Sequence, residues 1–571
     1  MIASRNELIL IVLFFLGLAL IASWPLPMHM DDMIPVSGTS LDGMHLLYAL
    51  TWSAQVLGDD PLNLFGATLF YPHTTPVAFF DHMVSLAAIV APVNWASGNM
   101  YWGYNVAWLL TFLLSGLGAY LLTRYLTDSK TAALLAGILF AFFPFRYHNA
   151  GQINVLAMMW IPFALLTLHL WVETRLKRQL FMFAAICIIQ FLSSAYSGVF
   201  LLVAAVVYMV VLWFTDRISV KEILANQSWI IVVVILLSVG VLIPFVAPYI
   251  NANQEDGFSR SLGEAALYSA QARDFVTPNP DSPLGKIVPW AESARHPLFP
   301  GVVGLGLFIF WIANRSWRRH PKRPELLFYL TLAIFSAVLA MGPALGDPES
   351  RIPLPFAGLF YAFPGFSFIR APVRFAIMMS LAISVLAGMG LSIIGRGTKT
   401  RSLLGSALIF VAAFELMLPI QITMFDPLPK GFPQVYHWLG SVEGDLAILE
   451  LPMPADESLE EEHHARYQLY SLLHRKRIAN GVAAHVPTLT QKVRTEMQEF
   501  PSGSSVARLR ELGINYVLLH TEHYDAIELA RMRGLIGNMD GIHLLEENQG
   551  IWVLDVVPRD RLQERSSSLG S

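Results

Sequence analysis

Residues 40–52 read SLDGMHLLYALTW, and residues 59–82 read DDPLNLFGATLFYPHTTPVAFFDH. Both stretches belong to residues 25–101, a segment that carries several Asp and His side chains and no Lys or Arg. Apolar stretches flank the segment, so we interpret it as a long loop between two membrane spans. Carboxylates and imidazoles at a membrane surface suit acid/base chemistry or the binding of a cation. Loops that cross a membrane are commonly poor in Lys and Arg, so the acidity alone does not establish a site.

The composition indicates a membrane protein. Of 571 residues, 55% are hydrophobic and only 14% are charged, which is too apolar for an ordinary soluble enzyme. The net charge is −4 and the basic residues form no stripe, so we expect no nucleic-acid partner. The single cysteine, Cys187, excludes an intrachain disulfide and a cysteine-based metal site.

Apolar stretches long enough, or nearly so, to cross about 30 Å of hydrocarbon predict roughly eleven transmembrane helices. They lie at residues 7–24, 102–123, 131–146, 153–173, 179–195, 197–214, 228–248, 299–314, 325–342, 373–395 and 403–422. The predicted fold class is therefore a polytopic α-helical membrane protein, with a membrane domain over residues 1–424.

The positions of the basic residues predict the orientation of these spans. Lys and Arg gather in every second loop, on the same side as Arg5, and the positive-inside rule makes that side cytoplasmic. The N-terminus is then cytoplasmic, and the first outer loop, residues 25–101, faces outward. An odd number of spans also places residues 425–571 on the extracytoplasmic side.

The sequence pattern of residues 425–571 is typical of a soluble α/β domain. Short apolar runs predict strands at Leu446–Leu451, Asn515–Leu519 and Gly550–Val556. Helical patterns lie near Ser458–His474, Ser504–Leu512 and Glu522–Ile536. The run Glu460–His464 on the first of these helices is interpreted as a solvated face rather than a metal cluster.

Asp42 is the first candidate catalytic residue. Residues 40–57 form an amphipathic pattern with Asp42 and His45 one turn apart. We expect this helix to lie along the membrane surface with Leu46, Leu47, Leu50 and Trp52 turned to the bilayer. Asp42 would then accept a proton from an acceptor hydroxyl or bind a divalent cation. The alternative is that Asp42 simply caps the helix.

Asp81 and His82 form a second candidate group, at the start of an apolar stretch, residues 82–97, that is too short to cross. Asp81 would serve as a second carboxylate or metal ligand, and His82 as a proton carrier. Alternatively, Asp81 caps the interfacial helix that follows.

Three arginines at predicted outer span ends, Arg146, Arg370 and Arg374, are candidates for binding a phosphate, because guanidinium offers forked donors to its oxygens. The alternative is snorkelling of an Arg from a span end. No phosphate-binding glycine motif, zinc spacing or nucleophile elbow occurs, so nucleotide chemistry is unsupported.

In this order the features resemble one known family, the polytopic bacterial GT-C-type membrane glycosyltransferases. Each motif is weak alone, but together they cover nearly the whole chain. The motifs are Asp42 ten residues before Trp52, Asp60–Phe65, Phe70–His73, Asp81-His82, Pro144–Arg146, Gly151-Gln152, Trp160–Pro162, Tyr196–Gly198, Phe299–Gly301, Pro364–Arg374, Glu450–Pro452, Asn480-Gly481 and Tyr516-Val517.

The resemblance implies transfer of a hexosyl or pentosyl group from a polyprenyl-phosphate sugar donor to a glycan, lipid or protein acceptor, outside a bacterial plasma membrane. Asp42 would be the general base, and Asp81 and His82 would assist. A divalent cation, Mg or Mn, on Asp42 and Asp81 is a further possibility. Arg146, Arg370 and Arg374 would hold the donor phosphate, and the spans the lipid tail. His45, Tyr71, Gln152 and Tyr196 would line the pocket.

One position departs from the family pattern: Gly151-Gln152 stands where relatives have a Gly-His pair, and Gln cannot relay a proton. Two other function classes stay open, namely a transporter or flippase for a lipid-linked glycan and a non-catalytic membrane binding protein. A transporter is expected to place ionisable groups near the bilayer midplane. Here the spans are apolar through their centres, which favours an interfacial enzyme.

Overall fold

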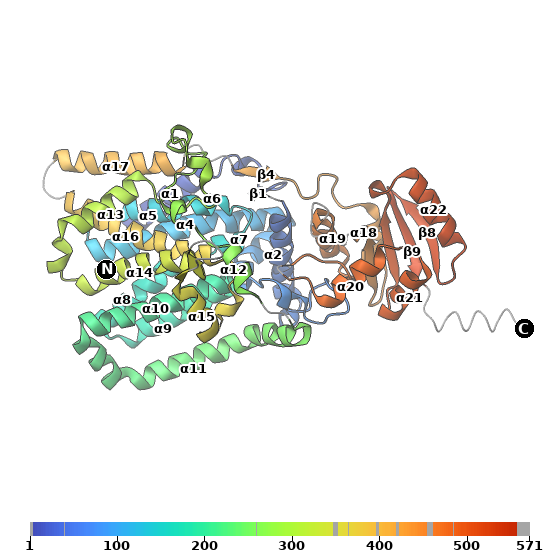
Figure 1. The fold of residues 1–571 in the computed structure, drawn as a ribbon, viewed down its shortest axis with the longest axis horizontal. Helices are drawn as coiled ribbons and strands as arrows, with labels where there is room; N and C mark the ends of the chain where they lie inside the picture. Colours follow the sequence, from blue (N-terminus) through green and yellow to red (C-terminus); the bar gives the residue numbers. More distant parts are fainter. Residues whose placement is uncertain are drawn as a thin grey trace, which may run out of the picture.

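The protein is described from a computed structural model that covers residues 4–38, 40–257, 260–345, 352–363, 365–394, 399–417, 422–453, 461–483 and 485–556. A bundle of helices forms one end of the elongated molecule, and a small sheet with its helices forms the other (Figure 1). The bundle consists of α1 (Arg5–Ala22), α4 (Met100–Thr127), α5 (Lys130–Ala141), α8 (Ile161–Thr174), α9 (Lys177–Ser193), α10 (Ala195–Thr215), α11 (Arg217–Asp256), α13 (Val302–Asn314), α14 (Arg323–Ala340), α16 (Ala376–Ile394) and α17 (Lys399–Met417).

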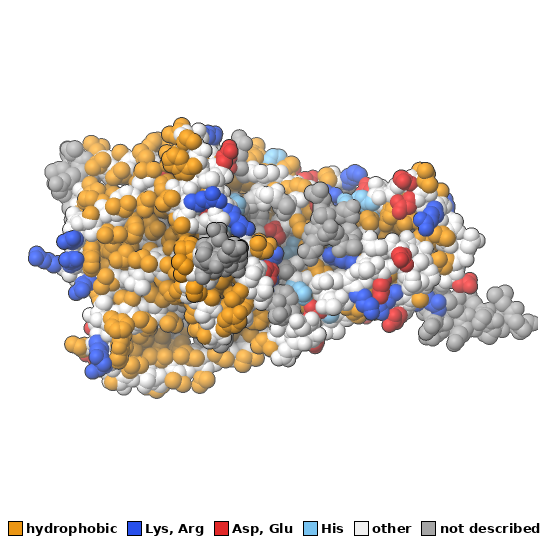
Figure 2. Space-filling view, in the orientation of Figure 1, with side chains coloured by type: hydrophobic (Ala, Val, Ile, Leu, Met, Phe, Trp, Pro, Cys, Tyr) orange, Lys and Arg blue, Asp and Glu red, His pale blue; other side chains and the backbone are white. Residues whose placement is uncertain are grey.

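Each of the eleven predicted spans contains one of these helices. Within the described residues, eight helical segments are long and apolar enough to cross a membrane, while α9, α13 and α17 fall short of that length or hydropathy. α4, α5 and α16 are buried along most of their length, whereas α11 exposes apolar side chains to the outside. Hydrophobic side chains accordingly cover the bundle surface, as expected of a multi-pass membrane protein (Figure 2).

The first outer loop is well structured. It contains β1 (Ile34–Val36), α2 (Leu41–Asp59) and α3 (Val84–Ser97). The prediction that α2 turns apolar side chains to the bilayer is wrong, because Leu46, Leu47, Leu50 and Trp52 are at most 7% exposed. α2 packs against α3 and α4 on one side and against α19 (Glu461–His474) of the C-terminal region on the other. A helix that carries so few charges on any face is expected to be buried on all sides.

Short outward elements connect the spans on the side of the first outer loop. They are α6 (Pro144–His148), α7 (Ile153–Leu156), α12 (Leu262–Leu267), α15 (Pro355–Ala362), the hairpin of β2 (Ala344–Leu345) with β3 (Ile352–Pro353), and a 3-10 turn at Pro372–Phe375. Arg146 and Arg374 lie in these elements, and Gln152 and Arg370 lie next to them.

The C-terminal region is an α/β unit built on a five-stranded sheet of order β6-β5-β7-β9-β8. β5 is parallel to β6 and β7, whereas β9 is antiparallel to β7 and β8. The strands are β5 (Ala447–Leu451), β6 (Arg477–Ile478), β7 (Tyr516–His520), β8 (Ile542–Asn548) and β9 (Ile551–Val556). The helices are α18 (Gln434–Ser441), α19, α20 (Thr488–Met497), α21 (Gly503–Leu512) and α22 (Ala526–Gly537).

The three predicted strands and three predicted helices of this unit are confirmed, while α18, α20, β6 and β8 were not predicted. Residues 458–460 of the first predicted helix lie outside the described residues. The prediction that this helix presents a solvated acidic face is wrong for His464, which is fully buried and contacts the amide of Asn480.

The sheet continues directly into the first outer loop. Ile478 N donates to Thr68 O at 2.6 Å, and Tyr71 N donates to Ile478 O at 3.0 Å. β1 also pairs with β4 (Thr423–Phe425), the strand that leads into the C-terminal region. At the far end of α11, Asp256 accepts from His485 and from the amide of Thr488. The C-terminal unit is therefore joined to the first outer loop at two places and directly to the bundle helix α11 at a third.

Candidate functional site

Asp42, Gln152 and Arg374 meet at the end of the bundle that carries the first outer loop. Gln152 Nε2 donates to Asp42 Oδ2 at 2.7 Å, and Arg374 Nη2 donates to Gln152 Oε1 at 3.1 Å. Asp42 stands in the first turn of α2, Gln152 immediately precedes α7, and Arg374 lies in the turn before α16. Three predicted site residues from distant parts of the chain therefore form one hydrogen-bonded row.

The amide at position 152 is suited to this row. A carboxylate can only accept and a guanidinium can only donate, so a group between them must donate on one side and accept on the other. Only one orientation of the Gln152 amide satisfies both neighbours. Gln152 thus couples Asp42 to Arg374 without carrying a charge of its own.

Asp42 is not the cap of its helix. The N-cap of α2 is Ser40, and Asp42 is an exposed residue of the first turn, where a carboxylate also benefits from the helix dipole. Capping therefore does not explain Asp42, and the carboxylate is accessible at the surface of the loop.

Arg374 and Arg370 have different surroundings. The Arg374 guanidinium lies 4.9 Å from the centroid of the Tyr196 ring and, within the described residues, has no ion-pair partner. Arg370 Nε lies 3.0 Å from Glu264 Oε1, and its Nη2 donates to the Tyr268 hydroxyl at 2.6 Å. Arg370 thus faces a carboxylate that it shares with Arg260, whose Nη1 lies 2.7 Å from the same oxygen, while Arg374 faces an aromatic ring and a neutral amide.

Asp81 joins the same outward turn as Gln152. Asn154 Nδ2 donates to Asp81 Oδ2 at 2.5 Å, and Asn154 is two residues after Gln152. The capping alternative for Asp81 is wrong, because the N-cap residue of α3 is Met83 and the Asp81 carboxylate accepts from Asn154 instead. The segment of residues 152–154 therefore donates a side-chain amide hydrogen bond to each candidate carboxylate, from Gln152 to Asp42 and from Asn154 to Asp81.

His82 is buried beside Asp81, and burial lowers the pKa of its imidazole to about 4. Its Nδ1 is positioned to accept from the amide of Val84 at 3.4 Å, and its carbonyl accepts from Ser53. At neutral pH His82 is consequently a neutral imidazole within a packed junction.

Two of the predicted pocket residues, His45 and Tyr71, do not join the row Asp42–Gln152–Arg374. The ring of His45 is buried, contacts Gln468 of α19 at 3.3 Å, and has a pKa lowered by burial. Tyr71 packs under the Arg477 guanidinium, 4.6 Å from its ring centroid, at the sheet edge. Both residues belong to the contact between the loop and the C-terminal unit.

Arg146 does not join the other two arginines. It is 1% exposed, lies over the Phe112 ring at 4.4 Å, and donates to the hydroxyls of Thr111 and Ser115. A guanidinium enclosed in this way presents no surface to a donor phosphate. Its placement supports a role in helix packing and does not support the predicted phosphate contact.

The described residues contain no group of three or more His, Cys, Asp or Glu side chains arranged to hold a metal ion. Asp42 and Asp81 each accept one amide hydrogen bond, and within the described residues the second oxygen of each has no such partner. Two carboxylates completed by water are a donor set that Mg²⁺ accepts. Cation binding by Asp42 and Asp81 stays a prediction.

Asn154, Glu264 and Tyr268 were missed by sequence reasoning. Asn154 follows Gln152 by two residues, and its amide could have been noticed as a partner for a second carboxylate. Glu264 and Tyr268 lie in the long outward segment between α11 and α13, where no local pattern distinguishes them.

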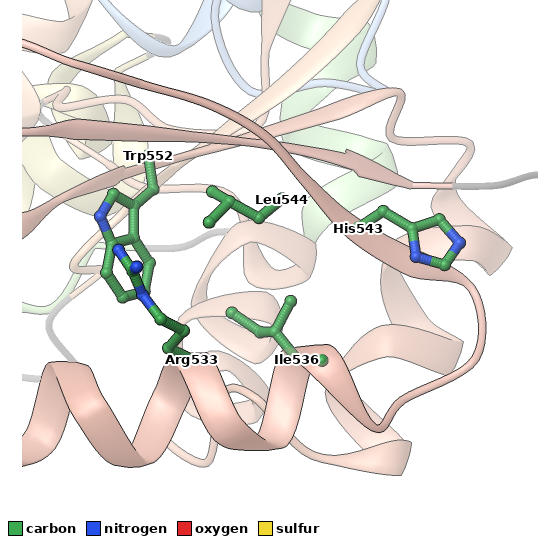
Figure 3. A pocket seen from close by; sticks show the side chains of 6 residues that line it. Arg533, Ile536, His543, Leu544 and Trp552 are labelled. Carbon is green, nitrogen blue, oxygen red and sulfur yellow. The ribbon is translucent and has the colours of Figure 1, made fainter.

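A cavity of about 290 Å³ lies apart from this site, between α22 and β8. Figure 3 shows the Arg533 guanidinium over the Trp552 ring, while His543 points away from them. Arg533 also pairs with Glu547. Arg533, the charged residue of this cavity, is thus already partnered, and the cavity adds nothing to the row around Asp42.

Solved structures with the same arrangement of helices are glycosyltransferases. The arabinofuranosyltransferase AftD from Mycobacteria matches with a TM-score of 0.54 and 15% identity, over 98% of this chain and 42% of that one. The oligosaccharyltransferase from Archaeoglobus fulgidus, tethered with an acceptor peptide, matches with a TM-score of 0.51 and 11% identity, over 91% of this chain and 70% of that one.

ArnT from Cupriavidus metallidurans, bound to undecaprenyl phosphate, matches with a TM-score of 0.50 and 12% identity, over 97% of this chain and 98% of that one. These identities relate the folds alone, and this chain spans less than half the length of AftD. The predicted GT-C-like fold is therefore confirmed.

No curated protein matches the sequence. One family model, described as "Domain of unknown function (DUF6311)", matches residues 59–417, which is more than half of the chain. The chain belongs to this family and has the fold of the GT-C membrane glycosyltransferases.

Proposed function

We propose that this protein transfers a hexosyl or pentosyl group from a polyprenyl-phosphate-linked donor to an acceptor hydroxyl on the extracytoplasmic side of a bacterial plasma membrane. The observation that carries the proposal is the row Asp42–Gln152–Arg374. It places an accessible carboxylate and a guanidinium that has no acidic partner among the described residues on the two ends of one amide. A base and a phosphate-binding group at this separation are what glycosyl transfer from a lipid phosphate requires.

In the proposed reaction, the acceptor oxygen attacks the anomeric carbon of the sugar, and the bond from that carbon to the phosphate oxygen breaks. Asp42 takes the proton from the acceptor hydroxyl, and the polyprenyl phosphate leaves with the bonding electron pair. Arg374 binds the phosphate and stabilises the charge that grows on it. Gln152 holds Asp42 and Arg374 at a fixed spacing, which keeps base and leaving group on opposite sides of the sugar.

Asp81 contributes a second negative charge near Asp42. If a divalent cation such as Mg or Mn binds, Asp42 and Asp81 would hold it, and it would supply charge neutralisation for the leaving phosphate. His82 is neutral at physiological pH and supports the loop, so a proton-carrying role for it is not part of the proposal.

The donor explains the architecture. A polyprenyl chain stays in the bilayer, so its enzyme must present a reaction centre at the membrane surface next to apolar helices. Among the similar structures, ArnT is bound to undecaprenyl phosphate and the oligosaccharyltransferase is tethered with an acceptor peptide. For this chain, the acceptor would approach between the first outer loop and the C-terminal unit, which is docked on that loop.

The test is transfer of radiolabelled sugar from a panel of polyprenyl-phosphate hexoses and pentoses in membranes that contain the intact protein. Asp42→Asn is compared at matched expression. The matched control is Asp59→Asn, which changes a carboxylate at the opposite end of α2 that pairs with Arg475 at 2.5 Å. We expect Asp42→Asn to lower transfer at least 100-fold and Asp59→Asn to leave it within a factor of two.

Equal transfer by the intact protein and Asp42→Asn would remove Asp42 as the base. The flippase alternative is measured separately, as translocation of a fluorescent lipid-linked glycan across vesicles reconstituted with the protein. Translocation without transfer for every donor, unaffected by Asp42→Asn, would overturn the glycosyltransferase proposal.

A further inference from the structure

A cavity of about 440 Å³ lies where the C-terminal half of α2, the facing ends of α3 and α4, and the C-terminal unit meet. The side chains that determine its chemistry are Thr51, Gln55, Asn94, Trp95, Tyr101 and Phe432. Its volume falls in the range of about 300–1,000 Å³ of small-molecule sites. We infer that this cavity is a carbohydrate-binding site, for a neutral saccharide, separate from the site around Asp42.

The cavity has hydrogen-bonding groups without partners. Asn94 Oδ1 accepts from the amide of Gly103 at 3.1 Å, which fixes the orientation of the Asn94 amide. Its Nδ2 is then a buried donor with no partner within the described residues, and Gln55 Oε1 is a buried acceptor in the same situation. Because leaving a buried polar group unpaired is unfavourable, a ligand that supplies one donor and one acceptor is favoured. A sugar hydroxyl supplies both.

The aromatic side chains provide the other half of saccharide recognition. Trp95, Tyr101 and Phe432 come from three different segments and line one cavity. Trp95 is 60% exposed, so its ring is available to a ligand. A sugar has apolar C–H faces between its hydroxyls, and such faces stack on aromatic rings while the hydroxyls bind amides.

The absence of a side chain at Gly58 makes room for the Trp95 ring. A Cβ at position 58 would lie 2.8 Å from Cζ2 of Trp95, so the indole rests directly on the backbone of α2. The ring is therefore held in place by the helix instead of projecting freely into the bilayer.

The charge of the lining decides between ligand classes. Among the described residues that line the cavity, none is Asp, Glu, Lys or Arg. A phosphate, a nucleotide or an anionic lipid headgroup would call for Arg or Lys, and a divalent cation for carboxylates. A neutral polyhydroxyl compound matches amides, a hydroxyl and aromatic rings without charge.

The cavity is separate from Asp42. Gln55 follows Asp42 by 13 residues, which is about 20 Å along a helix, and at 3.6 residues per turn it points to roughly the opposite side of α2. A saccharide bound here would not reach the Asp42 carboxylate. The site would instead hold a glycan against the junction of the first outer loop and the C-terminal unit, at a distance from the reaction centre.

The test uses the full-length protein in lipid nanodiscs and saturation-transfer NMR with a mixture of neutral hexose and pentose mono-, di- and trisaccharides. We expect at least one saccharide to receive saturation from the intact protein. Trp95→Ala and Asn94→Leu should each weaken its binding at least fivefold. Trp24→Ala is the matched control, because Trp24 is a similarly exposed tryptophan at the end of another helix and does not line the cavity.

Asp42→Asn should bind the saccharide as the intact protein does, so failure of the proposed transfer reaction leaves this test unaffected. No saturation of any neutral saccharide at millimolar concentration would overturn the inference, and so would equal binding by Trp95→Ala. Trp95 at a membrane surface could instead serve as an interfacial anchor. An anchoring role is recognised when Trp95→Ala and Trp24→Ala equally weaken the association of the protein with lipid and neither substitution changes saccharide binding.

Discussion

Gln152 donates to the Asp42 carboxylate at 2.7 Å, and this bond fixes which end of the amide faces Arg374. The position where the family resemblance predicts a histidine is thus occupied by a group that positions two charges and transfers no proton. The loss of a proton-relaying residue is compatible with catalysis if Asp42 itself receives the proton from the acceptor.

Gln152→Glu tests this relationship. A carboxylate at position 152 cannot donate to Asp42 and adds a like charge next to it. A hydrogen bond to a charged group contributes about 1.5–3 kcal/mol, so we expect transfer to fall roughly 10- to 100-fold. The measurement is the initial rate of labelled-sugar transfer. Asn538→Asp makes the same chemical change at an exposed position beyond α22 and should leave the rate unchanged; equal rates for both variants would contradict the coupling.

Arg374 and Arg370 are expected to contribute differently to donor binding. Arg370 already pairs with Glu264, whereas Arg374 has no acidic partner within the described residues. Arg374→Lys keeps the charge but loses the forked geometry. We expect it to raise the donor KM roughly tenfold, given about 1.4 kcal/mol per factor of ten. Arg370→Lys should raise it less than threefold. The reverse order would assign the donor phosphate to Arg370.

Arg146→Met separates packing from phosphate binding. The hydroxyls that Arg146 contacts also donate to backbone carbonyls, so they keep partners when the guanidinium is removed. Replacing a buried charge by an apolar side chain of similar length is often neutral or stabilising. We expect unchanged thermal stability and transfer within threefold of the intact protein, while Arg146→Ala leaves a cavity and loses about 2–4 kcal/mol. Loss of transfer in a stable Arg146→Met protein would restore the phosphate-binding role.

The spans and the central strands of the C-terminal unit could be predicted from the sequence, because both depend on local apolar patterns. The surroundings of α2 could not. Its helical pattern was evident, but its burial depends on α19, more than 400 residues away in the chain. An apolar pattern on most faces of a helix indicates burial on all sides. The pattern of residues 40–57 is instead interpreted as that of a surface helix.

The candidate site shows a similar limit. Asp42 is predicted from its place in the first outer loop, Gln152 and Tyr196 from the family resemblance, and Arg374 from its position at the outer end of a span; the fold brings the four together. Arg146, like Arg374, is predicted from a span end, but it is buried among helices. Both arginines stand at the end of a span in the sequence, and only the packing around each distinguishes a surface guanidinium from an enclosed one.

Gly481→Ala tests the docking of the C-terminal unit on the first outer loop. A Cβ at position 481 would lie 2.3 Å from Cε1 of Phe70, a fully buried ring of the loop. Overpacking of this kind typically costs about 1–3 kcal/mol. We expect a lower unfolding temperature and faster proteolysis of the segment between α17 and α18. Gly503→Ala, with nothing within 4 Å of its Cβ, is the control and should change neither measurement.

His474 is expected to make the C-terminal unit sensitive to acid. The side chain is 3% exposed, stacks on Tyr436 and accepts from the amide of Lys476, and burial lowers its pKa to about 3. An unfolded chain binds the proton near pH 6.5 and the folded protein does not. The stability that the neutral ring contributes is therefore complete above about pH 6.5 and is lost as the pH falls toward 3.

His474→Gln keeps an acceptor for the Lys476 amide and removes the titration. We expect the slope of unfolding free energy against pH, between pH 6 and pH 4, to decrease by up to about 1.4 kcal/mol per pH unit. The measurement is chemical unfolding of the detergent-solubilised protein, followed by tryptophan fluorescence at several pH values. His437→Gln changes an exposed histidine on the neighbouring α18 and should keep the slope of the intact protein. An unchanged slope in His474→Gln would show that other histidines, such as the buried His464 and the half-buried His523, account for the acid sensitivity.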